Sequence, residues 1–238
     1  VANVEGGLEL LKKENCDFIV SIGGGSPQDC GKAISVLATN GGKITDYEGV
    51  NKSQKKCLPI VAIATTAGTS AEVTINYVIT DEETHIKMIM VDRNTLASIT
   101  VNDPELMLSK PAGLTAATGM DALTHAIEGY TTKAAWEMTD MFHIKAIELI
   151  SDSLRGAVEN TPEGREGMAM GQYIAGMGFS NVGLGIVHSM AHALGAVYDT
   201  PHGVANAILL PTVMEYNADA TGDKYKYIAK AMGVEGVE

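Results

Sequence analysis

A short strand followed by a glycine-rich turn is the feature that most restricts the fold of this chain. Residues 17–22 form a mainly apolar run, which is typical of a buried strand, and Gly23–Gly25 follow it directly. Ser26 is a good helix N-cap, and Pro27 suits the first helical position after it. The segment therefore predicts a strand, a tight turn and a helix that runs to about Leu37.

The glycine turn and a second turn rich in hydroxyl groups are candidate contacts for a nucleotide. Glycine lets a backbone approach a phosphate closely, and the free N–H groups at a helix start attract anions. The first turn matches neither the GxGxxG fingerprint nor the P-loop motif, so a tight turn without a ligand explains it equally well. Residues 65–69 (Thr-Thr-Ala-Gly-Thr) follow a second predicted strand, residues 58–64. Because ligands of open α/β sheets bind at the carboxyl ends of the strands, two such turns together favour a nucleotide site.

The predicted elements change in kind near residue 104. Before it, strands alternate with helices, which is typical of a largely parallel sheet with helices on its faces. Further strand candidates there are residues 77–80, 87–91 and 97–101. After it, nearly every segment has a helical pattern: residues 115–130, 138–150, 164–177, 187–197 and 205–216. The sequence predicts an α/β dinucleotide-binding domain in residues 1–108 and an all-helical metal-binding domain in residues 109–238.

Both ends of the chain suggest a fragment. A helical pattern in residues 4–11 precedes the first predicted strand, and the sequence stops soon after another helix. We therefore expect a piece of a longer protein that lacks part of its N-terminal and C-terminal regions.

The charge of the chain argues against several classes of partner. Its formal net charge of −12 does not suit nucleic acid or an anionic membrane, although solubility alone also explains the acidity. Cys16, Cys30 and Cys57 form no CxxC pair and are typical of reduced thiols in a cytoplasmic protein. The sequence shows no signal peptide and no apolar run of membrane-spanning length.

Four residues of the predicted helical domain are candidate ligands of a divalent metal. Asp121 and His125 are four residues apart, a spacing that places both side chains on one face of a helix. His188 and His202 supply two more imidazoles, and one carboxylate with three imidazoles suits iron(II) or zinc. Asp-x-x-x-His pairs also arise by chance, and His188 and His192 could be core histidines, so the pair alone predicts a metal only weakly.

Longer stretches of the chain resemble the iron-dependent (group III) alcohol dehydrogenases. The resemblance covers nearly the whole sequence and is specific. It rests on residues 23–29 (Gly-Gly-Gly-Ser-Pro-Gln-Asp), 65–69, 71–83, 121–130 (Asp-Ala-Leu-Thr-His-Ala-Ile-Glu-Gly-Tyr), 176–185 and 200–211.

The resemblance implies roles for individual residues. Asp121, His125, His188 and His202 match the metal ligands of the family, with iron(II) as the expected metal and zinc as the alternative. His192 matches a histidine near the nicotinamide and the substrate, and we expect it to relay a proton rather than to bind the metal. The positions that match NAD contacts are Gly23, Gly24, Gly25, Ser26, Pro27, Thr65, Thr66, Thr69, Thr74, Asn76 and Lys87.

The implied function is hydride transfer between NAD(H) and a short-chain alcohol or diol and its aldehyde. Lactaldehyde and 1,2-propanediol are the expected pair. Residues 42–49 look more like the branch of 1,3-propanediol dehydrogenases, which keeps that substrate as an alternative. Two other functions remain as alternatives: a non-redox metalloenzyme similar to the dehydroquinate synthases, and a domain that only binds nucleotide. The expected partners are a small alcohol or aldehyde and a further copy of the chain, in a homo-oligomer that is at least a dimer.

Overall fold

The predicted strand, glycine turn and helix are present in the structure, a computed structural model that describes residues 1–82, 84 and 86–236. Strand β1 (Ile19–Gly23) leads into the turn, and helix α2 (Gly25–Asn40) follows it. The prediction that Ser26 caps this helix is wrong, because α2 begins at Gly25 with Gly24 as its N-cap. Pro27 is tolerated inside the first turn because N–H groups there have no partner within the helix.

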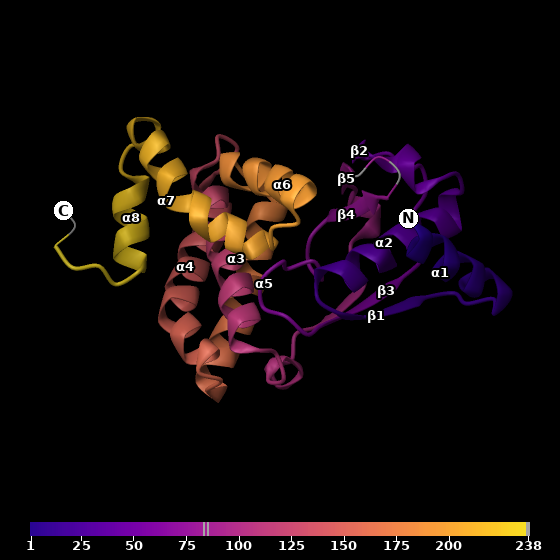
Figure 1. The fold of residues 1–238 in the computed structure, drawn as a ribbon, viewed down its shortest axis with the longest axis horizontal. Helices are drawn as coiled ribbons and strands as arrows, with labels where there is room; N and C mark the ends of the chain where they lie inside the picture. The colour runs from indigo at the N-terminus through magenta and orange to yellow at the C-terminus, as the bar shows by residue number, and fades with distance from the viewer. Residues whose placement is uncertain (83, 85, 237–238) are drawn as a thin grey trace. The chain divides into compact units, whose positions relative to one another are not determined.

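The elements of the chain group into two units (Figure 1). Residues 1–65 and 71–102 form the α/β unit, and residues 66–70 with the chain from Asp103 onwards form the helical unit. This order confirms the predicted fold class, an α/β region followed by an all-helical region. The predicted domain boundary between residues 108 and 109 stays a prediction.

The described strands of the α/β unit form two three-stranded sheets. In the first sheet, β1, β3 (Ile60–Ala64) and β6 (Ile99–Val101) lie in the order β1-β3-β6 and are all parallel, as predicted. The second sheet has the order β2-β5-β4, from β2 (Gly49–Val50), β5 (Ile86–Val91) and β4 (Asn76–Asp81). Its strands β4 and β5 are antiparallel, which the expectation of a largely parallel sheet did not include. The short connection between them explains the difference, since parallel neighbours need a long crossover.

Helix α2 supplies much of the core of the α/β unit. Its residues Ala33, Val36 and Leu37 recur at helical spacing, and all three are buried. They share one apolar cluster with Tyr77 of β4 and Met90 of β5. The remaining helices of this unit are α1 (Ala2–Lys13) and the short 3-10 helices η1 (Ile44–Tyr47) and η2 (Arg93–Thr95).

One face of the parallel sheet is more exposed than predicted. Residues 17–22 are predicted to form a buried strand, but Phe18, Val20 and Ile22 are 53%, 49% and 60% exposed. Ser21, which alternates with them, is buried, and α2 packs on this sheet. Strands of a parallel sheet are buried only where both faces are covered. In the part of the chain that the structure describes, the face of Val20 and Ile22 stays open.

The helical unit is built around one central helix. Helix α3 packs mainly on α4, α5 and α7, and it also contacts α8. The five helices predicted for this region are present, and each is longer than predicted. The elements are η3 (Pro104–Met107), α3 (Ala112–Thr131), α4 (Glu137–Val158), α5 (Pro162–Val182), α6 (Ile186–Tyr198), α7 (His202–Thr221) and α8 (Lys224–Ala231).

Over residues 1–82, 84 and 86–236, no helix combines the length and the apolar character that a bilayer crossing needs.

Candidate metal centre

Helix α3 presents three ionisable side chains on one buried face. Asp121, His125 and Glu128 follow at intervals of four and three residues, which places them above one another on the helix. All three are buried. Charged groups that are removed from water need charged or hydrogen-bonding partners, and the neighbouring helices supply them.

Helices α6 and α7 bring two further histidines to Asp121. Asp121 Oδ1 lies 3.5 Å from His188 Nε2 and 3.5 Å from His202 Nε2. It lies 3.8 Å from His125 Nε2. Ligand atoms of Asp121, His188 and His202 all lie within 4.8 Å of one another. The four residues singled out from the sequence thus meet around one carboxylate oxygen.

These distances have the size that a coordinated metal requires. Bonds of about 2.1 Å to a tetrahedral metal place neighbouring ligand atoms about 3.4 Å apart. The separations of 3.5, 3.5 and 3.8 Å around Asp121 Oδ1 are close to that value. One carboxylate and three imidazoles also form a donor set that binds zinc or iron(II). The residues present therefore fit a divalent metal.

Two hydrogen-bond acceptors orient the histidine rings. Glu128 Oε2 lies 2.6 Å from His188 Nδ1, and the Gly68 carbonyl oxygen lies 3.3 Å from His125 Nδ1. A carboxylate and a carbonyl can only accept, so each requires a proton on Nδ1. A neutral ring then presents the lone pair of Nε2 to the side of Asp121, as metal-binding histidines do.

The charges of the cluster shift its pKa values strongly. Burial raises the pKa of Asp121, but the charges of His125, His188 and His202 and a hydrogen bond from His188 outweigh burial and hold it well below its usual range. Burial lowers the pKa of His125 to about 3. Burial also acts to lower the pKa of His188, yet hydrogen bonds to Asp121 and Glu128 raise it to about 9. Such opposed shifts inside one buried cluster are typical of functional sites.

Glu128 and Asn206 belong to the cluster but were missed in the sequence. Asn206 is buried, and its Nδ2 lies 2.7 Å from Asp121 Oδ1, 3.2 Å from His188 Nε2 and 3.3 Å from His202 Nε2. It follows His202 by four residues on α7, and Glu128 follows His125 by three on α3. These helical spacings were the available signal, although nothing in them distinguishes the two residues from other polar positions.

His192 lies beside the cluster. It follows His188 by one helical turn on α6, and its ring centroid lies 5.0 Å from that of His202 and 6.4 Å from that of His188. Like His125, it is not among the residues whose ligand atoms group within 4.8 Å, but His125 Nε2 lies 3.8 Å from Asp121 Oδ1. The proton-relay role expected for His192 stays a prediction.

Among the predicted nucleotide contacts of the α/β unit, the glycine turn and Thr65 lie together. The amide of Thr65 donates to the Gly23 carbonyl over 3.0 Å, so the ends of β1 and β3 lie side by side. Gly23 has a φ of +146°, and a Cβ there would lie 2.6 Å from Pro27 Cγ, so this position requires glycine. Gly24, Gly25, Ser26 and Lys87 belong to the same unit, whereas Thr66 and Thr69 belong to the helical unit.

Buried Lys32 binds the backbone of Thr74 and Asn76, two of the predicted nucleotide contacts. In the sequence, Lys32 was considered only as part of a P-loop motif that did not match. Lys32 Nζ donates to the Thr74 carbonyl over 2.7 Å and to the Asn76 carbonyl over 2.8 Å. Burial lowers the pKa of Lys32 to about 8, although Asp29 and Glu72 act in the opposite direction. Lys32 thereby holds the segment that leads into β4 against α2.

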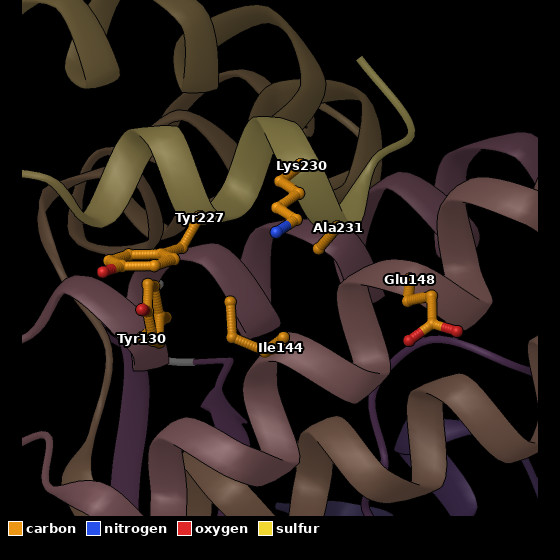
Figure 2. A pocket seen from close by; sticks show the side chains of 6 residues that line it. All are labelled: Tyr130, Ile144, Glu148, Tyr227, Lys230 and Ala231. Atoms are coloured by element: carbon orange, nitrogen blue, oxygen red, sulfur yellow. The ribbon is translucent and has the colours of Figure 1, made fainter. Parts of the chain in front are cut away.

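A pocket of about 320 Å³ also lies in the helical unit (Figure 2). Tyr227, Lys230 and Ala231 of α8 face Tyr130 and Ile144 across it (Figure 2). Its lining contains none of the predicted site residues. Since the perturbed ionisable groups converge around Asp121 instead, the histidine cluster is the better candidate for a catalytic site.

Comparison with known proteins agrees with the chemistry of the cluster. A model of iron-containing alcohol dehydrogenases matches residues 1–104, and a model of the C-terminal part of the Fe-containing alcohol dehydrogenase family matches residues 115–238. Lactaldehyde reductase of Escherichia coli (strain K12) is 56% identical over 234 residues, which cover 98% of this chain and 61% of that protein. The chain thus spans about three-fifths of the length of that relative.

Two solved structures show the same fold. A crystal structure of 1,3-propanediol oxidoreductase has a TM-score of 0.96 and 49% identity, and the match covers 100% of this chain and 63% of that one. A sulfoacetaldehyde reductase from Bifidobacterium kashiwanohense in complex with NAD+ has a TM-score of 0.88 and 34% identity, over 97% of this chain and 62% of that one.

Proposed function

The chain belongs to the iron-containing alcohol dehydrogenase family, and from this premise we propose that the whole protein interconverts a short-chain alcohol or diol and its aldehyde. The proposed reaction is hydride transfer with NAD(H), and the proposed metal is iron(II), with zinc as the alternative. The observation that carries the proposal is the buried cluster, in which one oxygen of Asp121 lies within 3.8 Å of three imidazole nitrogens.

Each group of residues has one task in this reaction. Asp121, His125, His188 and His202 hold the metal, and the glycine turn with the start of α2 binds the pyrophosphate of NAD(H). When bound, a divalent metal would supply a Lewis acid, and NAD(H) would supply a hydride acceptor or donor. His192 carries the alcohol proton to water, and its position one turn after His188 supports that role.

The proposed substrate pair is lactaldehyde and 1,2-propanediol. The likeness to lactaldehyde reductase supports this choice. The likeness to 1,3-propanediol oxidoreductase supports the 1,3-diol as the second candidate. Comparing the two diols at equal concentration, by the absorbance of the NADH formed, separates these possibilities.

The metal ligands are tested in the full-length protein by His188→Ala, His202→Ala and Asp121→Asn. Each should lose both the bound metal, measured by elemental analysis after loading with iron(II), and the turnover of NADH with lactaldehyde. Asp152→Asn is the matched control, because Asp152 is exposed on α4. Metal retained at full stoichiometry in both histidine variants would contradict the four-ligand site.

A further inference from the structure

The carboxylate of Glu128 holds the start of helix α6. Its Oε1 accepts a hydrogen bond from the Val187 amide over 2.8 Å, and its Oε2 lies 3.4 Å from the His188 amide nitrogen. The N-cap of α6 is Gly185, which has no side chain that could satisfy these amides. The first N–H groups of a helix lack partners within it, and a negative charge there is favourable. Glu128, from α3, therefore replaces the missing cap of α6.

The same carboxylate holds the ring of His188. Glu128 Oε2 lies 2.6 Å from His188 Nδ1, while His188 Nε2 lies 3.5 Å from Asp121 Oδ1. A metal bound through Nε2 requires the proton of His188 on Nδ1, and Glu128 is an acceptor for that proton. Asp121 and Glu128 both belong to α3, so one helix sets the position of the acidic ligand and the orientation of a histidine ligand.

The space at Gly185 fits this arrangement. A Cβ at Gly185 would lie 2.6 Å from Glu128 Oε1, closer than real Cβ atoms approach other atoms. The backbone at Gly185 has a φ of −134°, which any residue adopts. The absence of a side chain therefore leaves room for the carboxylate rather than serving the backbone conformation.

We propose that Glu128 is a positioning residue of the metal site, because it fixes His188 both through its ring and through the N-terminus of its helix. The inference rests on the proposed function, since it requires His188 to be a metal ligand. Glu128 is not among the residues whose ligand atoms group around Asp121, and its oxygens accept hydrogen bonds from the Val187 amide and His188 Nδ1.

Glu128→Gln in the full-length protein is the direct test. Glutamine keeps the size of the side chain but replaces one acceptor oxygen by an NH₂ group, which can only donate. Because His188 Nδ1–H and the Val187 amide are both donors, either orientation of the glutamine loses one contact. Zinc(II) affinity, measured by competition with a chelator, should fall about 10- to 100-fold. The exposed Glu166→Gln on α5 is the matched control and should bind zinc as the wild type does.

Gly185→Ala is the second variant, and it changes neither a metal ligand nor Glu128. The added methyl group displaces the carboxylate, so zinc affinity should fall in the same direction. In the zinc-loaded wild type, the Nδ1–H proton of His188 should give a downfield NMR resonance, which both variants should shift or lose. A merely structural role would lower the thermal midpoint and leave this resonance and the zinc affinity unchanged.

The outcomes separate the inference from the proposed function. If His188→Ala loses zinc but Glu128→Gln and Gly185→Ala bind it within threefold of the wild type, the role of Glu128 is refuted and the proposed ligands stand. If His188→Ala itself binds zinc like the wild type, the proposed metal site fails. Reduced affinity in both test variants with an unchanged control supports the positioning role, even if one of them is recovered in low yield.

Discussion

Replacing His143 with methionine should remove a source of acid sensitivity from the helical unit. His143 lies on α4 and is fully buried, and neither of its ring nitrogens has a hydrogen-bond partner in the described part of the chain. Its ring fills a slot between Gly129 of α3 and Gly178 of α5, where a Cβ at either glycine would overlap it. The imidazole is therefore held by packing and not by hydrogen bonds, and burial disfavours its charged form.

The size of the effect follows from the two pKa values of His143. Burial, together with the charge of Lys224, lowers its folded-state pKa from 6.5 to about 4. Between these values the unfolded chain binds a proton that the folded protein does not, so stability falls as the pH falls. Lowering the pH from 8 to 5 should therefore cost the wild type about 2 kcal/mol through this residue.

At pH 8, where His143 is neutral in both states, two other effects oppose each other. Each buried nitrogen without a partner costs about 1–3 kcal/mol, which methionine removes. Repacking a side chain of similar volume costs up to about 1.5 kcal/mol, and the flexible thioether adapts to an irregular slot. The His143→Met protein should thus be at least as stable as the wild type at pH 8. At pH 5 the difference between their free energies of unfolding should be larger by about 2 kcal/mol.

Urea unfolding of the metal-free, full-length proteins measures this difference. Free energies of unfolding from circular dichroism at pH 8, 7, 6 and 5 give the difference between variant and wild type at each pH. Other ionisable groups contribute to both curves and cancel in the difference. A difference that does not change between pH 8 and pH 5 would refute the reasoning, because it would mean that His143 titrates alike in both states.

Three further changes test other parts of the molecule. Gly24→Val should raise the KM for NADH and leave the metal content unchanged; the φ of −84° at Gly24 permits valine, so an unchanged KM would show that the turn is only structural. Lys32→Met should lower the free energy of unfolding by about 2–4 kcal/mol, because the buried Thr74 carbonyl and the partly buried Asn76 carbonyl lose their donor, whereas the exposed Lys133→Met should have little effect in the same urea titration. His192→Gln should lower turnover while elemental analysis finds wild-type metal content; loss of metal would instead make His192 a ligand.

The sequence predicted the elements of the fold better than their ends and pairing. Apolar runs and helical spacing located β1, β3 and the helices from α3 to α7, because burial leaves a local pattern. Strand β2 contains only two residues, Gly49–Val50, which is too short for any period to appear. The start of α2 was misplaced because Ser26 and Pro27 carry local cap preferences that the backbone at Gly24 overrides. Local preferences yield where a turn between strand and helix imposes its own geometry.

For the candidate site, helical spacing indicated Asp121 and His125, whereas Glu128 was missed although it lies on the same face of α3. The spacing of four residues between Asp121 and His125 on α3 is visible in the sequence. Glu128 meets His188 across 60 residues of sequence, and Lys32 meets Thr74 across 42. Their side chains differ in no local way from surface acids and lysines. Only the packing of α6 on α3, and of β4 on α2, gives them a partner.

The charge of the cluster gives an independent reason why a dication suits it. Burial acts to raise the pKa values of Asp121 and Glu128, but hydrogen bonds and histidine charges around them hold both below their usual range. Two carboxylates thus stay ionised inside the protein, where unpaired charge is costly. A proton on His188, whose pKa is raised to about 9, balances only one of them. A divalent metal bound by neutral imidazoles balances both carboxylate charges. The buried charges of Asp121 and Glu128 are therefore better neutralised by a dication than by a single proton on His188.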